Sequence, residues 1–396
     1  MKSVMVIIDG LGDEPIQELD NQTPLEAAFI PHIQYIADKG RVGRINTTFE
    51  GFPIESMVCI MGLIGYEPDK FYPSGRASFE ATAQGILLNE GDLILRCNLV
   101  SADLDKQILT DFTAGQISDS NAKKIISKIK LPYDNWELYP AQSYRNILVI
   151  RGANVDVRKI KCFEPHMHIG EKINSMMPTS NDKKAVTLIQ QINKFLLDTQ
   201  KQITQMNIHD NKASMLWVWS PSTKAVWPTF KDRTGLNAAF VGGLDFLHGI
   251  AMAADIDFEK IPGATGYIDT NYSAKAEYAM RYIDEYDFVL VHINAADEEA
   301  HLHNYKGKIK AIEKVDKYVV APILDKLSKE YTDSYKIIVL GDHMTRCVDG
   351  RHTDQPVPYA LCGVGIRSEQ HQQFSEKNCL LYVPSSSLKI LNEITK

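Results

Sequence analysis

The chain has 396 residues, more than one domain usually contains, so its length favours two domains. Hydrophobic residues make up 44% of the chain and charged residues 23%, which excludes a disordered, collagen-like or coiled-coil protein and is typical of a soluble globular one. Lys and Arg total 43 against 50 Asp and Glu, giving a formal net charge of −7. Without a basic excess, nucleic acid is not expected to be the main partner.

Cysteine spacing and the N-terminus narrow the class further. The six cysteines show no CxxC spacing, so neither a disulfide framework nor a thiolate zinc site is expected. The apolar run in MKSVMVIIDG is too short for a signal sequence or a membrane span. We therefore expect a cytoplasmic protein, whose oligomeric state the sequence leaves open.

The predicted elements, taken in chain order, indicate an α/β fold. Buried strands are predicted at residues 3–8, 147–150, 288–293 and 336–340. Between the first and second of these, residues 95–150 are typical of short strands joined by polar turns, which favours an α+β insert. A helix is predicted over about 186–203. Alternating strands and helices elsewhere favour a mainly parallel sheet.

Acids and histidines follow three of these strands. Asp9 ends the first strand, and Asp342 and His343 directly follow the last one. Asp297 and His301 are four residues apart after the strand at 288–293, a spacing that places both side chains on one face of a helical turn. Since the carboxyl ends of parallel strands meet at one sheet edge, we expect these residues to gather there.

A further histidine, His352, lies in the turn-rich segment GRHTDQPVPY. Each of these fragments alone is more often a solvated loop or a hydrogen-bonded histidine, but together they predict a divalent metal site. Carboxylate and imidazole ligands without thiolates favour Mn²⁺, Zn²⁺ or Mg²⁺, and a site with two ions suits phosphoryl or sulfuryl transfer. The spacing by itself identifies no nucleophile.

Eight segments between residue 5 and about residue 360 occur in an order typical of one enzyme family. They are IIDGLGDEP, TPLEAA, FPIESMVCIMGLIGYEP, IPGATGYIDT, NAADEEAHLHN, KAIEKVDK, GDHMT and RHTDQPVP. In these segments the chain resembles the archaeal-type cofactor-independent, that is 2,3-bisphosphoglycerate-independent, phosphoglycerate mutases of the alkaline phosphatase superfamily. The resemblance implies a metal-binding, phosphatase-like core at residues 1–73 and 235–396, and an inserted substrate-binding domain at residues 74–234.

The resemblance also implies roles for individual residues. Ser56 would be the nucleophile that forms a phosphoserine, and its position after a Gly-Phe-Pro turn suits the start of a helix. Two divalent ions would be bound, with Mn²⁺ expected first and Zn²⁺, Mg²⁺ or Co²⁺ as alternatives. One ion would be held by Asp9, Ser56, Asp342 and His343, and the other by Asp297, His301 and His352. Substrate would be bound by Arg76, Arg96, Asn98, Arg145 and His166.

The implied activity is the interconversion of 2- and 3-phosphoglycerate in glycolysis and gluconeogenesis, with a small phosphorylated metabolite as the partner. The sequence departs from the family pattern near substrate. The family's PGSD, PHD and WLWG segments read Ile54-Glu55-Ser56-Met57, Pro165-His166-Met167 and Trp217-Val218-Trp219-Ser220 here. A shifted substrate preference is one interpretation of these changes.

Two other enzymatic functions and one binding function stay open on the sequence. The segment GATGYIDTNYSAKA resembles a bacterial branch of these proteins proposed to act as homoserine kinases in threonine biosynthesis. A kinase would need a phosphoryl donor, and the chain has no GxxxxGK[ST] loop. A phosphatase acting on a small phosphorylated metabolite is a further alternative. A binding module without catalysis would be expected to lack some of the seven predicted ligands, whereas all are present.

Overall fold

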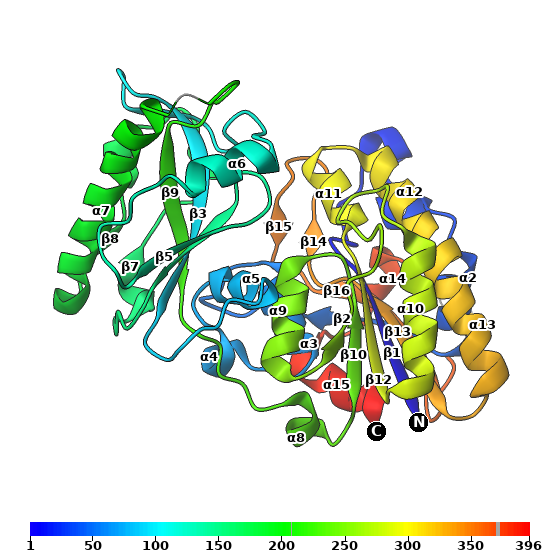
Figure 1. Ribbon diagram of the computed structural model, residues 1–396. Coiled ribbons are helices and arrows are strands. Elements are labelled where there is room, and N and C mark those ends of the chain that lie inside the picture. The colour runs from blue at the N-terminus through cyan, green and yellow to red at the C-terminus, as the bar shows by residue number, and fades with distance from the viewer. Residues whose placement is uncertain (207, 370–372) are drawn as a thin grey trace. The chain divides into compact units, whose positions relative to one another are not determined.

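The computed structural model describes residues 1–206, 208–369 and 373–396. The chain divides into two compact units, Met1–Tyr72 with Trp227–Lys396 and Pro73–Val226 (Figure 1). Trp227 belongs to the first unit because its ring stacks on Tyr66, with centroids 4.5 Å apart, and its Nε1 donates to the carbonyl of Phe71 at 2.8 Å. Residues 227–234, which we expected in the insert, therefore group with the first unit.

The first unit is built on an eight-stranded sheet. In spatial order its strands are β11 (Asp257–Phe258), β10 (Ala238–Val241), β12 (Phe288–Ile293), β1 (Lys2–Ile8), β13 (Tyr335–Leu340), β16 (Val357–Gly363), β2 (Arg41–Asn46) and β17 (Ser385–Ser386). The five strands from β11 to β13 are parallel. β16 pairs antiparallel with both of its neighbours, and β17 is parallel to β2. The prediction of a mainly parallel sheet is confirmed.

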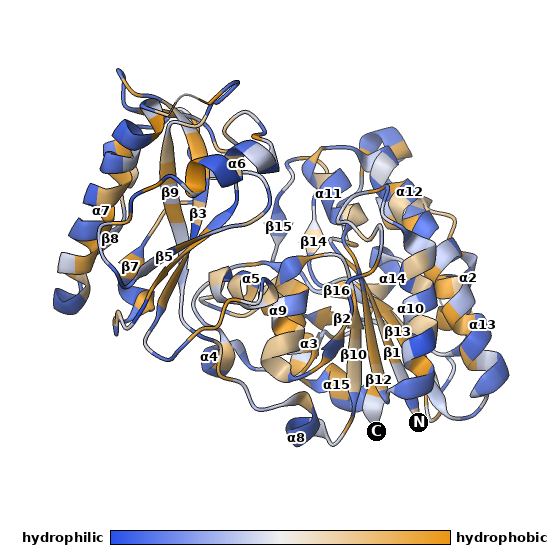
Figure 2. Cartoon of the chain, viewed as in Figure 1, coloured by the Kyte–Doolittle hydropathy of each residue, from blue (hydrophilic) through white to orange (hydrophobic). Residues whose placement is uncertain are grey.

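The middle strands of this sheet are buried along their length. β12 and β13 are buried at every residue, and β1 is buried from Ser3 to Ile8. Their residues are apolar on both faces (Figure 2), as expected for parallel strands that helices cover on both sides. The strands predicted at 3–8, 288–293 and 336–340 are confirmed as β1, β12 and β13.

Helices cover both faces of the sheet (Figure 1). They are α1 (Pro24–Ala27), α2 (Pro31–Lys39), α3 (Ser56–Leu63), α4 (Pro68–Phe71), α8 (Phe230–Thr234), α9 (Asp245–Ala254), α10 (Tyr272–Glu285), α11 (Ala295–His301), α12 (Tyr305–Val315), α13 (Ala321–Glu330), α14 (Glu376–Cys379) and α15 (Ser387–Thr395), with a π-helical turn at Asp316–Val320 and a 3₁₀ turn at Gln17–Leu19. α2, α10, α12 and α13 share one apolar core with alternate residues of β1. α3, α9 and α15 lie on the opposite face.

The second unit is built on an antiparallel sheet around the long strand β3 (Leu93–Asp103). β3 pairs with β4 (Ile108–Asp111), β6 (Asn146–Ile150) and β9 (Met215–Ser222), and β5 (Trp136–Pro140) pairs with β6. The predicted strand at 147–150 is thus β6, and it belongs to this antiparallel sheet and not to the parallel one. It pairs with the long strand β3 and with β5, the strand that precedes it in the sequence.

Three helices complete the second unit. They are α5 (Ala77–Ala83), α6 (Asp119–Ile126) and α7 (Lys183–Thr204), joined by the strand pair β7 (Ile160–Lys161) and β8 (Thr179–Ser180) and by 3₁₀ turns at Val157–Lys159, Pro165–Met167 and Ile173–Met176. α7 confirms the helix predicted over 186–203. Its Thr199 hydroxyl accepts a hydrogen bond from the backbone of Leu216 in β9, at 3.0 Å, which fastens the helix to the sheet. Among the described residues, no helix is long and apolar enough to span a bilayer.

Candidate active site

Three neighbouring strands of the first unit end at one point of its sheet. β12, β1 and β13 lie side by side and parallel, so their carboxyl ends bring together the residues that follow them. Asp9 follows β1, and its backbone N–H donates to the carbonyl of Ile293 at 3.0 Å. Asp342 and His343 follow β13, and α11 begins directly after β12. The predicted gathering of acids and histidines at this edge is what the structure shows.

The first of two groups at this edge is wholly buried. It consists of Asp9, Asp342 and His343, which are 0% exposed and whose ligand atoms all lie within 4.8 Å of one another. We call it the inner group. The Oγ of Ser56 lies 3.3 Å from both carboxylate oxygens of Asp9 and 3.1 Å from Nε2 of His343. The structure therefore places Ser56 beside the three residues with which the sequence grouped it.

Ser56 is the first residue of α3, with Glu55 as the N-cap. The first N–H groups of a helix have no partner inside the helix, and the helix dipole makes this end positive. α3 is apolar on all sides, and every residue from Met57 to Leu63 is buried. The packed helix thus fixes the position of the serine hydroxyl.

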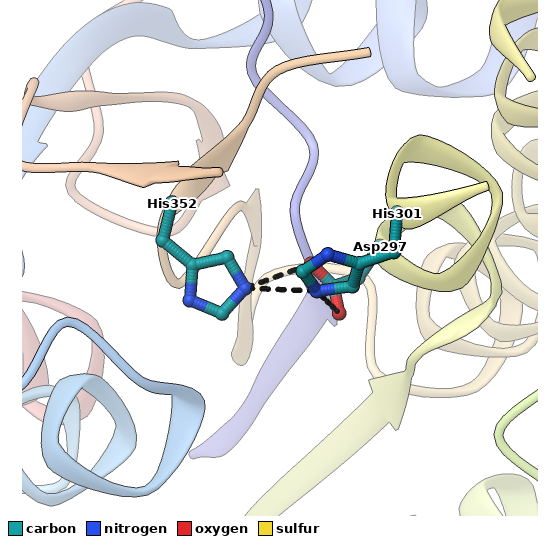
Figure 3. Close-up of side chains that lie close together, drawn as sticks. All are labelled: Asp297, His301 and His352. Atoms are coloured by element: carbon teal, nitrogen blue, oxygen red, sulfur yellow. Dashed lines mark hydrogen bonds and ion pairs between the residues drawn. The ribbon is translucent and has the colours of Figure 1, made fainter. Parts of the chain in front are cut away.

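The second group lies beside the inner group and opens to solvent. It consists of Asp297, His301 and His352 (Figure 3), and we call it the outer group. Nε2 of His301 lies 3.2 Å from Oδ2 of Asp297, and Nε2 of His352 lies 3.4 Å from Oδ1. The His301 side chain is 40% exposed, against 10% for Asp297. β14 (Met344–Thr345) and β15 (His352–Thr353) pair antiparallel, so the chain turns back and places His352 close to His343.

Both histidines of the outer group are held by their second ring nitrogen, Nδ1. Nδ1 of His301 and Nδ1 of His352 each lie 2.7 Å from a carbonyl oxygen, of Gly350 and Ile54 respectively. Such bonds fix a ring with its Nε2 turned inward, as in protein metal sites. The two Nε2 atoms lie only 3.1 Å apart, a distance that suits nitrogens sharing one cation.

Thr345 connects the two groups. Its hydroxyl donates to Oδ1 of Asp297 at 2.6 Å and lies 3.1 Å from Nδ1 of His343. Sequence reasoning assigned Thr345 no role, although it stands two residues after His343 within the GDHMT segment. Gly10 makes room for this contact: it has a φ of +65°, and a Cβ there would lie 2.8 Å from the Thr345 hydroxyl.

The charges of the inner group are not balanced within the group. Burial, followed by the nearby charges of Asp342 and Asp297, raises the pKa of Asp9 well above its usual range. Oδ2 of Asp342 is buried and accepts no hydrogen bond from the described residues. Crowded acids with an unpaired oxygen would be stabilised by a bound cation, so these residues fit a divalent ion.

In the outer group, the charge of the acid is balanced by the two histidines beside it. Burial alone would raise the pKa of Asp297, but hydrogen bonds from His301 and His352 outweigh burial and hold that pKa well below its usual range. The bond to Asp297 correspondingly raises the pKa of His301, and it raises that of His352 against the opposing effect of burial. This acid and its two imidazoles also form a fitting ligand set for a divalent ion.

His292 is a buried residue at this edge to which sequence reasoning assigned no role. It is the fifth residue of β12, and its Nε2 lies 3.3 Å from Oδ2 of Asp9. Burial lowers the pKa of His292 to about 4. The sequence does hold one signal that could have singled it out, since five of the 11 histidines fall within residues 292–352.

The five predicted substrate residues lie in the second unit, around Trp219. The guanidinium of Arg96 lies 4.2 Å from the ring centroid of Trp219, and that of Arg76 lies 5.7 Å away. Oδ1 of Asn98 accepts a hydrogen bond from the Trp219 indole at 3.3 Å. The ring of His166 packs edge-on at 5.7 Å. Four of the five residues therefore lie against the side chain of Trp219.

Arg145 completes this cluster through its charge. Burial, and then the charges of Arg76 and Arg145, lower the pKa of Arg96 to about 10, although the carboxylate of Glu80 opposes the shift. Glu80 lies 2.9 Å from Nε of Arg96 and 3.6 Å from Nε of Arg76, and sequence reasoning missed it. Three guanidinium groups with one acid between them leave an excess of positive charge, which suits an anionic ligand.

Solved structures share the fold of this chain. A structure of a protein from Pyrococcus horikoshii matches 99% of this chain and 96% of its own, with a TM-score of 0.80 at 24% identity. A cofactor-independent phosphoglycerate mutase from Thermoplasma acidophilum matches 100% of this chain and 99% of its own, with a TM-score of 0.67 at 25% identity. These matches confirm the predicted α/β class and show that the fold is shared with a solved cofactor-independent phosphoglycerate mutase.

Sequence comparison gives the family. The family model described as 2,3-bisphosphoglycerate-independent phosphoglycerate mutase matches residues 37–208. A mutase of that name from Methanothermobacter thermautotrophicus is 32% identical over 384 residues, which cover 95% of this chain and 92% of the relative. One from Methanosarcina acetivorans is 35% identical, covering 91% of this chain and 90% of the relative. The chain belongs to the family of 2,3-bisphosphoglycerate-independent phosphoglycerate mutases, and the predicted resemblance is confirmed.

Proposed function

We propose that this protein interconverts 2- and 3-phosphoglycerate without 2,3-bisphosphoglycerate, through a phosphoserine at Ser56. The observation that carries the proposal is the position of Ser56, at the start of a buried helix and between a carboxylate and an imidazole, in a chain that belongs to this family. The relatives named above are mutases, and this favours the mutase over the homoserine kinase and phosphatase alternatives.

Two divalent ions are part of the proposal. The inner group with Ser56 would hold one ion and the outer group the other, with Mn²⁺ first and Zn²⁺, Mg²⁺ or Co²⁺ as alternatives. Such ions, when bound, lower the pKa of a hydroxyl and neutralise the charge on phosphate oxygens. What supports this assignment is that each group is a compact set of carboxylate and imidazole ligands, and that the inner acids lack a compensating charge of their own.

The chain itself supplies the nucleophile and its orientation. In the proposed reaction the Ser56 oxygen forms a bond to phosphorus while the bond from phosphorus to one glycerate oxygen breaks. The neighbouring glycerate hydroxyl then takes the phosphoryl group back, and the bond to Ser56 breaks, so no second phosphoryl donor is needed. The free N–H groups at the start of α3 would hold phosphate oxygens during both transfers.

Substrate recognition is assigned to the arginine cluster of the second unit, which we propose as the substrate-binding insert. Arg76, Arg96 and Arg145 would bind the anionic groups of the substrate, and Asn98 and His166 would supply polar contacts. Stacking on Trp219 fixes the Arg96 fork before substrate arrives, which lowers the entropy lost on binding. The proposed substrate is a small phosphorylated metabolite of glycolysis, and a cytoplasmic location stays a prediction.

Phosphorus NMR tests the activity directly. The purified protein, supplied with Mn²⁺ and 3-phosphoglycerate alone, should produce 2-phosphoglycerate until the two reach a constant ratio. A parallel sample receives Mn²⁺, homoserine and ATP. Formation of O-phosphohomoserine with no 2-phosphoglycerate in the first sample would overturn the mutase in favour of the kinase. Release of inorganic phosphate as the sole product would instead indicate a phosphatase.

A further inference from the structure

His292 is a histidine at the active edge that belongs to neither the inner nor the outer group. Its side chain is 1% exposed, and neither ring nitrogen has a hydrogen-bonding partner among the described residues. A buried polar group without a partner costs free energy, so a histidine in this position calls for an explanation. Its surroundings on the helix side are apolar: the ring of Phe246 packs edge-on at 6.0 Å.

The backbone that carries His292 is held firmly. In the sheet, His292 is paired with Ile7 of β1, two residues before Asp9. Nζ of Lys275 lies 3.4 Å from the carbonyl oxygen of His292 and 3.3 Å from that of Thr265. Lys275 is itself 1% exposed. The imidazole is therefore presented to the active edge from a fixed point.

A carboxylate oxygen of the inner group lies close to the His292 ring. Nε2 of His292 lies 3.3 Å from Oδ2 of Asp9, outside hydrogen-bond alignment but within reach of a small rotation of the carboxylate. On its other side, Oδ1 of Asp9 lies 3.3 Å from Nε2 of His343. His292 does not belong to either compact ligand group. It therefore lies beside Asp9 and outside both sets of candidate ligands.

We infer that His292 is a positioning residue for Asp9: its Nε2–H donates to Oδ2 and turns Oδ1 toward the ion of the inner group. The inference rests on the proposed function, since it assumes that the inner group binds a divalent ion. Carboxylates that bind metals are commonly oriented by such hydrogen bonds, and losing the bond weakens metal binding. In this chain the bond would also satisfy a ring nitrogen that otherwise stays unpaired.

The experiment measures binding of Mn²⁺ alone by calorimetry, and the visible absorption of Co²⁺ bound in its place. His292→Leu removes the donor and keeps an apolar filling, and should weaken Mn²⁺ binding about 10- to 100-fold and alter the Co²⁺ spectrum. His292→Gln keeps an N–H donor near the position of Nε2 and should recover most of the loss. His248→Leu is the matched control: His248 stacks on Phe258 and belongs to neither group, so this variant should bind Mn²⁺ as the wild type does.

Thermal unfolding in chelator establishes that each variant is folded, and His292→Met replaces His292→Leu if the latter is not. Wild-type Mn²⁺ affinity and an unchanged Co²⁺ spectrum in a folded apolar variant would overturn the inference, as would equal losses in His292→Gln and His292→Leu. Failure of the wild type to bind Mn²⁺ would overturn it as well. If the wild type binds Mn²⁺ but does not convert 3-phosphoglycerate, only the proposed function fails.

Discussion

The inner and outer groups use the same kinds of side chain in different proportions. The inner group has two acids and one histidine and is fully buried, whereas the outer group has one acid and two histidines and is partly exposed. Accordingly, the pKa of Asp9 is raised, first by burial and then by its acidic neighbours, while that of Asp297 is lowered because bonds to two histidines overcome burial. The inner group therefore depends on a cation for its charge balance, and the outer group supplies most of its own.

The largest expected effect is at Ser56, whose hydroxyl contacts the inner group. Ser56→Ala should reduce turnover of 3-phosphoglycerate by roughly 10⁴-fold or more, because it removes the proposed nucleophile. Mn²⁺ affinity of the outer group should stay within a few-fold of wild type, since the Ser56 hydroxyl contacts Asp9 and His343 and is not bonded to the outer residues among the described contacts. Steady-state kinetics and calorimetry provide the two measurements, and undiminished turnover would refute the phosphoserine.

Because the two groups differ in charge balance, replacing the aspartate of each should change stability in opposite directions when a chelator keeps metal ions away. Asp9 has a raised pKa in the folded chain, so its contribution to stability is present at low pH and is lost as pH rises through that pKa. At pH about 7.5 the buried, charged Asp9 therefore costs stability. Asp9→Asn removes that cost and should raise the unfolding temperature by roughly 2–4 °C, the effect of about 1 kcal/mol in a unit of this size. Calorimetric scans measure it; a lower unfolding temperature would contradict the charge-crowding account.

Asp297→Asn should act in the other direction. The lowered pKa of Asp297 contributes stability above the ordinary aspartate value of 3.8, and this is lost as pH falls. The raised pKa values of its two histidine partners contribute below the ordinary value of 6.5, and this is lost as pH rises. The stabilisation is therefore greatest between these values, and Asp297→Asn in chelator should lower the unfolding temperature most near pH 5.5, again by roughly 2–4 °C.

A smaller effect is expected from a substitution in the arginine cluster, which should weaken substrate binding and leave ion binding unchanged. Arg96→Leu should raise KM for 3-phosphoglycerate about 10- to 100-fold, because a charge-assisted contact worth roughly 1.5–3 kcal/mol is lost. Mn²⁺ affinity should not change. Arg158→Leu is the control: Arg158 is 78% exposed and pairs with Asp156 on the surface of the same unit. Altered Mn²⁺ binding in Arg96→Leu would contradict this division of roles.

The smallest effect concerns the link between the two groups. Thr345→Val keeps the shape of the side chain but removes the hydroxyl that bonds Asp297 and lies beside Nδ1 of His343. Mn²⁺ affinity should fall about tenfold at each group, at the lower end of what such supporting contacts contribute. A titration resolving two binding events would show whether both are weakened. Loss at one group alone would mean that Thr345 supports that group without connecting the two.

The sequence predicted the strand-end residues well because they are set by local rules. Asp9, Asp342 and Asp297 follow apolar strands whose parallel pairing brings their ends to one edge, so pattern and topology suffice. Thr345 and His292 were missed because their roles depend on distances of 3.3 Å or less across the sheet edge, which no spacing rule gives. The strand at 147–150 was predicted within the insert because short strands and polar turns surround it in the sequence, and it lies in the antiparallel sheet of the second unit.

His352 joins the outer group to the segment that carries the nucleophile. Its Nε2 faces Asp297, while its Nδ1 lies 2.7 Å from the carbonyl of Ile54, two residues before Ser56. One imidazole ring therefore contacts both the outer group and the backbone two residues before the serine. Replacing His352 would remove a side chain from the outer group and a contact beside the nucleophile in a single step.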